Sequence, residues 1–104
     1  MFSRYLHLMT ALHALGQTAD DVADTLDDGG WSGVPGDAMQ CPIAQYLVDV
    51  IPDAVDAAVS EYAATVFTAD GQMTETVMPA GASAFVGRFD DGAYRYLADS
   101  NSHD

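Results

Sequence analysis

The chain of 104 residues is predicted to fold as one small α+β domain in the order helix, helix, loop, helix, β-hairpin and C-terminal helix. Three observations predict this class. Apolar residues recur at helical spacing in four segments, two strand-like runs flank an Asp-Gly turn, and 49% of the residues are hydrophobic, which is enough for a core. We expect the domain to span residues 1–99 and residues 100–104 to form a flexible tail.

The first helix is expected at residues 2–15. Its apolar residues recur every three or four positions: Phe2, Tyr5, Met9 and Leu12, with Leu6 and Leu15 beside them. Gly16 then supplies the glycine that commonly follows the last helical residue. The apolar run after Arg4 also resembles a short signal peptide. The helical spacing of this run and its two histidines instead favour a helix that belongs to the folded domain and is not cleaved. We therefore expect a cytoplasmic protein.

A second helix is expected to begin after Thr18, a favourable N-cap residue. Asp20 and Asp21 would lie in its first turn, where the helix dipole stabilises negative charge. At about 100° per residue, the apolar residues of this segment fall on one side of the helix. They are Ala19, Val22, Ala23 and Leu26. The pattern predicts an amphipathic helix whose apolar side faces the core.

Five aspartates occupy an arc of roughly 120° on the other side of this helix. They are Asp20, Asp21, Asp24, Asp27 and Asp28. Asp27 and Asp28 lie in the last turn, where the dipole disfavours each carboxylate by about 0.3–1 kcal/mol. Their presence there favours the interpretation that a basic surface docks on them. A merely solvated helix face is the alternative interpretation.

Glycines and prolines predict a loop at residues 29–40, in which Trp31 and Met39 are the large apolar side chains. Pro42 is typical of the first position of a helix, and Pro52 ends the apolar stripe of that third helix. The stripe consists of Ile43, Leu47, Val50 and Ile51.

The next segments predict a hairpin. Residues 53–61 fit either a helix or a strand, because their apolar spacing suits both. Strands are expected at about 62–68 and 73–78, joined by the turn at Asp70-Gly71.

Pro79 then begins the last helix, and Gly92 ends it. Its predicted core stripe is Ala82, Phe85, Val86 and Phe89. Beyond it, Tyr94, Tyr96 and Leu97 are expected to cover an edge of the core.

The net charge restricts the classes of partner. Sixteen acidic residues against three basic ones give a formal charge of −13, and the chain contains no lysine. Such a charge repels nucleic acid and anionic membranes, and it attracts proteins built to bind them. No apolar run reaches the ~18 residues of a membrane span. A GC-rich genome or a high-salt cytoplasm are alternative causes of this composition.

Cys41 is the strongest candidate for a catalytic residue. A thiol at the start of a helix, before Pro42, is favoured as the thiolate, and His7 or His13 would have to act as its base. A small buried hydrophobic residue is the alternative. The two histidines lie six positions apart, on different faces of a helix, so they do not form the usual helical zinc pair. We therefore expect no metal site and no cofactor.

Residues 30–47 contain a glycine-rich loop followed by the motif CPxAxYL, here Cys41-Pro42-Ile43-Ala44-Gln45-Tyr46-Leu47. Residues 85–92 match a closing FVxxFDxG helix. These segments, about a quarter of the chain, resemble a set of small uncharacterised proteins of actinobacteria and their phages. The resemblance implies a high-GC bacterial or phage source and an intracellular setting, and it implies no activity.

The sequence thus predicts a non-enzymatic, intracellular interaction protein whose five aspartates dock on a basic surface. In its sharper form this is a phage-type inhibitor or DNA mimic that blocks a nucleic-acid-binding host protein. One alternative is a protein-binding module that uses Trp31 and Met39 as anchors. Another is a small thiol enzyme centred on Cys41. Direct DNA binding is not expected, because a basic recognition helix is missing. A homodimer is possible, but it would have to keep the five aspartates of one copy away from those of the other.

Overall fold

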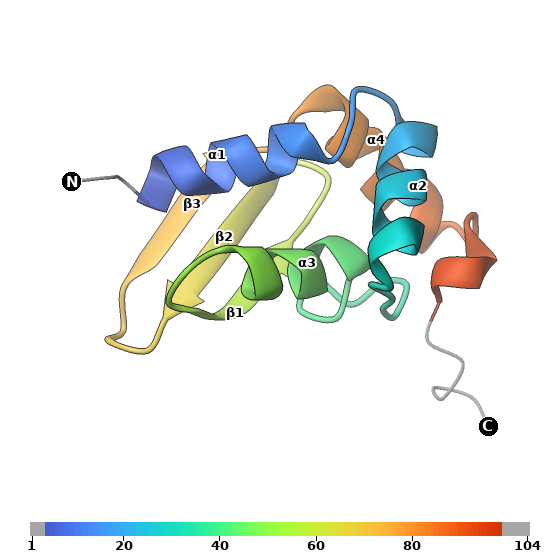
Figure 1. The fold of residues 1–104 in the computed structure, drawn as a ribbon. Coiled ribbons are helices and arrows are strands. Elements are labelled where there is room, and N and C mark those ends of the chain that lie inside the picture. Colours follow the sequence, from blue (N-terminus) through green and yellow to red (C-terminus); the bar gives the residue numbers. More distant parts are fainter. Residues whose placement is uncertain (1–3, 99–104) are drawn as a thin grey trace.

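The computed structural model describes residues 4–98, which fold into helices packed on an antiparallel sheet (Figure 1). The elements are α1 (Arg4–Ala14), α2 (Ala19–Gly29), α3 (Pro42–Val50), β1 (Ala54–Val59), β2 (Ala63–Thr68), β3 (Met73–Val77), α4 (Ala80–Asp90) and the 3-10 helix η1 (Arg95–Leu97). The predicted α+β class is confirmed. The expected tail at residues 100–104 and the predicted core residue Phe2 lie outside the described residues.

The three strands form a meander in the order β1-β2-β3, with every neighbouring pair antiparallel. The predicted hairpin is confirmed as β2 and β3, and its turn places Gly71 at φ 87°, where glycine is favoured. The undecided segment 53–61 contains β1, which pairs with β2 through Ala57 opposite Val66. Ala57 and Val59, two positions apart, are both buried, which is the two-residue period of a strand and not the spacing of a helix.

Helices α1 and α3 lie across the same face of the sheet, α1 over β3 and α3 over β1 (Figure 1). The buried residues of this face include Ala57, Val66 and Thr76. Side chains on the opposite face are half-buried or exposed, as for Phe67 and for Val77, which is 79% exposed. The sheet is therefore covered by helices on one side.

Helices α2 and α4 pack against each other beside the sheet, and η1 lies next to α2 (Figure 1). The predicted core stripes of both helices are confirmed, since all their members are buried. They are Ala19, Val22, Ala23 and Leu26 in α2, and Ala82, Phe85, Val86 and Phe89 in α4. Gly81 allows α4 to approach the turn after α1, because a Cβ there would lie 2.8 Å from the carbonyl oxygen of Gly16.

Two predicted stripes were partly wrong. Leu8 and Leu12 of α1 are buried, as is Leu15 directly after the helix, whereas Tyr5 and Leu6 are 48% and 54% exposed. Apolar residues occur around most of this helix, so spacing alone could not fix which side faces the core. In α3, Ile43 and Leu47 are buried as predicted, and so is Ile51 directly after the helix, whereas Val50 is 41% exposed.

Candidate functional site: the acidic face of α2

The amphipathic helix α2 is held by caps at both ends. The predicted N-cap is confirmed, since the backbone N–H of Asp21 donates to Thr18 Oγ1 at 3.1 Å. At the other end Gly30 adopts the left-handed conformation, with φ 80°. The N–H of Trp31 then donates to the carbonyl oxygen of Leu26 at 3.0 Å, as in a Schellman motif. These bonds fix where α2 begins and ends, and the burial of its apolar side leaves the opposite side facing solvent.

All five aspartates of α2 lie on its solvent side, and we call them the acidic face: Asp20, Asp21, Asp24, Asp27 and Asp28. One ion pair reaches them among the described residues: Nη1 of Arg88 in α4 lies 4.0 Å from Asp20 Oδ1. Both side chains are largely exposed, so this pair contributes little. Most of the negative charge of the acidic face is therefore not paired with a cation among the described residues.

Asp20 is positioned by Tyr94. The Tyr94 hydroxyl donates to Asp20 Oδ1 at 2.6 Å, and the Tyr94 ring stacks on Phe85 of α4 with ring centroids 5.3 Å apart. Tyr94 itself has a φ of 56°, an uncommon value for a residue other than glycine. Partial desolvation and the bond to Asp20 raise the pKa of Tyr94. Asp20 thus takes part in holding η1 against α2.

Tyr96 lies beside the acidic face. Its side chain is 58% exposed and meets Tyr94 edge to face, with ring centroids 6.3 Å apart. Partial desolvation, followed by the charges of Asp24 and Asp27, raises the pKa of Tyr96. Three residues after α4 were expected to cover an edge of the core: Leu97 is 2% exposed and Tyr94 packs against the core, so the expectation was wrong for Tyr96 alone.

The surface formed by these residues combines carboxylates with an aromatic ring. Asp20, Asp24 and Asp27 occupy successive turns of one helix, so their Cα atoms are spaced by about 5–6 Å. Carboxylates bind guanidinium and ammonium groups through charge-assisted hydrogen bonds, and a tyrosine face attracts the same cations. Sequence reasoning missed Tyr96 and Arg88, because neither is near α2 in the sequence.

The glycine-rich loop is attached to the fold at several points. The Trp31 indole N–H donates to Asp49 Oδ2 at 2.7 Å, and the ring meets Tyr46 edge to face at 5.0 Å. Trp31 is half-buried, so part of its ring is available to a partner. The N–H of Gly36 donates to Asp90 Oδ1 at 2.8 Å. Met39, the other proposed anchor, is 45% exposed.

Cys41 occupies the N-cap position of α3 and is 3% exposed. Burial raises the pKa of its thiol from 9.0 to about 11, although the N–H groups of Ile43 and Ala44 act in the opposite direction. The expectation of a lowered pKa was therefore wrong, since desolvation outweighs the helix N-terminus. Both His7 and His13 are exposed on α1.

Within residues 4–98, no group of three or more metal-binding side chains is close enough to hold an ion. In the same range, no helix has the length and apolar character that crossing a membrane would require. Comparison with known proteins finds no matching family model, no matching curated protein and no matching solved structure. Arguments about function therefore depend on the geometry of the acidic face and its neighbours.

Proposed function

We propose that this protein is a non-enzymatic, intracellular interaction protein that docks through the acidic face on a basic surface of a nucleic-acid-binding protein. The observation that carries the proposal is the exposure of all five α2 aspartates with Arg88 as their nearby cation in the described chain. The sharper form of the proposal is a DNA mimic, such as a phage-type inhibitor, that occupies the nucleic-acid site of a bacterial host protein.

Two features support docking over mere solvation. Asp27 and Asp28 lie in the last turn of α2, which contains no basic residue, so the helix dipole opposes their charge. Tyr96 adds an exposed aromatic ring to the same surface, and tyrosine is enriched among residues that dominate binding energy. The spacing of about 6 Å between carboxylates on successive turns is similar to that of phosphates along one strand.

The other two hypotheses receive less support from the structure. Trp31 already contacts Tyr46 and Asp49, so a partner would have to compete with these contacts. Cys41 is buried, and the raised pKa of its thiol disfavours the reactive thiolate near neutral pH.

The test compares two variants of equal net charge in affinity capture from host lysate. The face variant carries Asp24→Asn, Asp27→Asn and Asp28→Asn. The control variant carries Asp53→Asn, Asp56→Asn and Glu75→Gln, which are exposed positions at β1 and β3. Asp20 is left unchanged because it holds Tyr94. We expect the wild type and the control to capture a basic nucleic-acid-binding protein at low salt, and the face variant to bind it about tenfold or more weakly.

The mode of inhibition is tested on the captured protein. If the acidic face mimics DNA, the wild type should displace a DNA probe from that protein, and moderate salt should weaken the displacement. Equal binding by the face variant and the control would refute the acidic face as the docking site. Binding that persists at high salt would contradict an electrostatic interface.

A further inference from the structure

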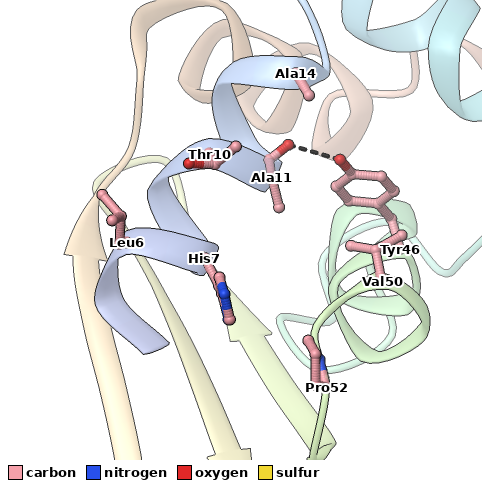
Figure 2. A pocket seen from close by; sticks show the side chains of 8 residues that line it. All are labelled: Leu6, His7, Thr10, Ala11, Ala14, Tyr46, Val50 and Pro52. Atoms are coloured by element: carbon pink, nitrogen blue, oxygen red, sulfur yellow. Dashed lines mark hydrogen bonds between the residues drawn. The ribbon is translucent and has the colours of Figure 1, made fainter. Parts of the chain in front are cut away.

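A groove separates α1 from the C-terminal part of α3 (Figure 2). It has a volume of about 560 Å³. Its lining consists of Leu6, His7, Thr10, Ala11 and Ala14 of α1, together with Tyr46, Val50 and Pro52. The Tyr46 hydroxyl donates to the carbonyl oxygen of Ala11 at 2.6 Å (Figure 2). This hydrogen bond joins α3 to α1, the two helices that form the walls of the groove.

The groove exposes apolar side chains to solvent. Leu6 is 54% exposed and Val50 is 41% exposed, while Ala11 is half-buried between them. Exposed apolar surface of this kind is typical of an interaction site when it is contiguous.

The α1 wall of the groove belongs to the part of the chain that carries no acid, whereas Asp49 and Asp53 lie next to Val50 and Pro52 in the sequence of the other wall. None of the sixteen acidic residues occurs in residues 1–19, and none of the eight lining residues has a carboxylate. Two copies of a chain with a net charge of −13 repel each other most where their acids are concentrated. A contact between copies is therefore least opposed at α1.

The shape of α1 is complementary to itself. Leu6, Thr10 and Ala14 follow one another at intervals of four residues, so they lie along one side of the helix. In an antiparallel pair of α1 helices with its two-fold axis at Thr10, Leu6 of each copy faces Ala14 of the other. A projecting side chain then meets a small one twice, as a two-fold interface requires.

We propose that the groove is the face on which a second copy of this chain docks, α1 against α1, to form a homodimer. The antiparallel arrangement places the α2 helix of each copy beyond opposite ends of the paired α1 helices, since α2 follows the C-terminal end of α1 (Figure 1). Both acidic faces thereby stay apart and accessible, and a dimer would present two of them to a partner.

The first test measures the dimer dissociation constant of the full chain by sedimentation equilibrium at low and high salt. Salt screens the repulsion between two acidic copies, so dimerisation should strengthen as salt rises. Docking of the acidic face on a basic partner should weaken over the same range. The homodimer and the docking of the acidic face thus respond to salt in opposite directions, and either can be refuted without the other. A chain that is monomeric at all salt and protein concentrations tested would overturn the homodimer.

Variants then locate the interface. Leu6→Asp should raise the dimer dissociation constant on the order of tenfold or more, because it buries an unpaired charge against the second copy. Ala14→Trp should have the same effect without a new charge, because it fills the space that Leu6 occupies. Val77→Asp is the matched control, since Val77 is 79% exposed on the far face of the sheet. Dimers that resist both groove variants would place the contact elsewhere and refute the proposal.

A cross-link provides a measurement that does not depend on affinity. Thr10 is exposed and lies on the proposed two-fold axis, whereas the native Cys41 is buried. Thr10→Cys should therefore form a disulfide-linked dimer under mild oxidation, and Val77→Cys should not. Equal cross-linking of the two variants would indicate random collision and would argue against the α1 interface.

Discussion

The hydroxyl of Tyr94 donates a 2.6 Å hydrogen bond to Asp20, 74 positions earlier in the chain. This bond joins the first turn of α2 to the segment after α4, at one end of the acidic face. The left-handed backbone of Tyr94 orients the side chain for this contact and for stacking on Phe85. The C-terminal segment of the described chain therefore helps to position the candidate site.

Tyr94→Phe should retain the stacking on Phe85 and remove the bond to Asp20. We expect a loss of about 0.5–1.5 kcal/mol in the free energy of unfolding, at the lower end because the pair is exposed. Urea denaturation measures the loss. Tyr96→Phe is the control, since no hydrogen bond to Asp20 depends on it. Equal losses in the two variants would show that the bond to Asp20 does not stabilise the fold.

Gly29→Ala should destabilise the protein, although alanine normally stabilises a helix relative to glycine by about 1 kcal/mol. A Cβ at Gly29 would lie 2.0 Å from Cζ3 of Trp31, so the indole ring would have to move. Trp31 is the single tryptophan, and its fluorescence should therefore shift with the substitution.

The double variant Gly29→Ala with Trp31→Ala separates the two effects. Once the ring is absent, alanine at position 29 should stabilise the helix, so the sign of its effect should reverse relative to the single variant. If Gly29→Ala stabilises the protein in both backgrounds, the close packing of the ring on Gly29 is wrong.

Stability should fall at alkaline pH through Cys41. Its pKa rises from 9.0 to about 11 in the folded protein, so the unfolded chain releases the thiol proton first. The stabilisation is present below pH 9 and is lost as the pH rises to about 11, with a total on the order of 3 kcal/mol. Cys41→Ala should remove this part of the pH dependence, leaving the part due to tyrosines.

The same residue gives a kinetic test. In the folded protein Cys41 should react with a thiol reagent at pH 8 far more slowly than in urea, because the buried thiol stays protonated. Rapid modification of the native protein would contradict this burial and would revive the thiol-enzyme hypothesis.

Much of the fold could be predicted from the sequence, because local signals agree with the packing. Thr18 and Gly30 bound α2, and the Asp70-Gly71 turn fixes the hairpin. The orientation of α1 could not be predicted, since its apolar residues surround most of the helix. For the site, the five aspartates could be found from spacing alone. Tyr96 and Arg88 approach the aspartates only through tertiary contacts, which the periodicity of the sequence does not predict.

The position of Asp28 gives the sharpest test of whether the acidic face is maintained for binding. Asp28 lies in the last turn of α2, where the dipole disfavours negative charge, whereas Asp21 lies in the first turn, where the dipole favours it. Asp28→Asn should therefore raise the free energy of unfolding by about 0.3–1 kcal/mol, and Asp21→Asn should lower it by a similar amount.

The two variants remove the same charge by the same chemical change, so each serves as the control for the other. If the acidic face binds a partner, Asp28→Asn should gain stability and lose affinity together, which is the compromise common at functional sites. If acidity is only an adaptation to salt or genome composition, Asp28→Asn should gain stability without any loss of binding. Denaturation at low salt combined with the capture assay distinguishes these results, and a stability change of the same sign in both variants would refute the dipole argument.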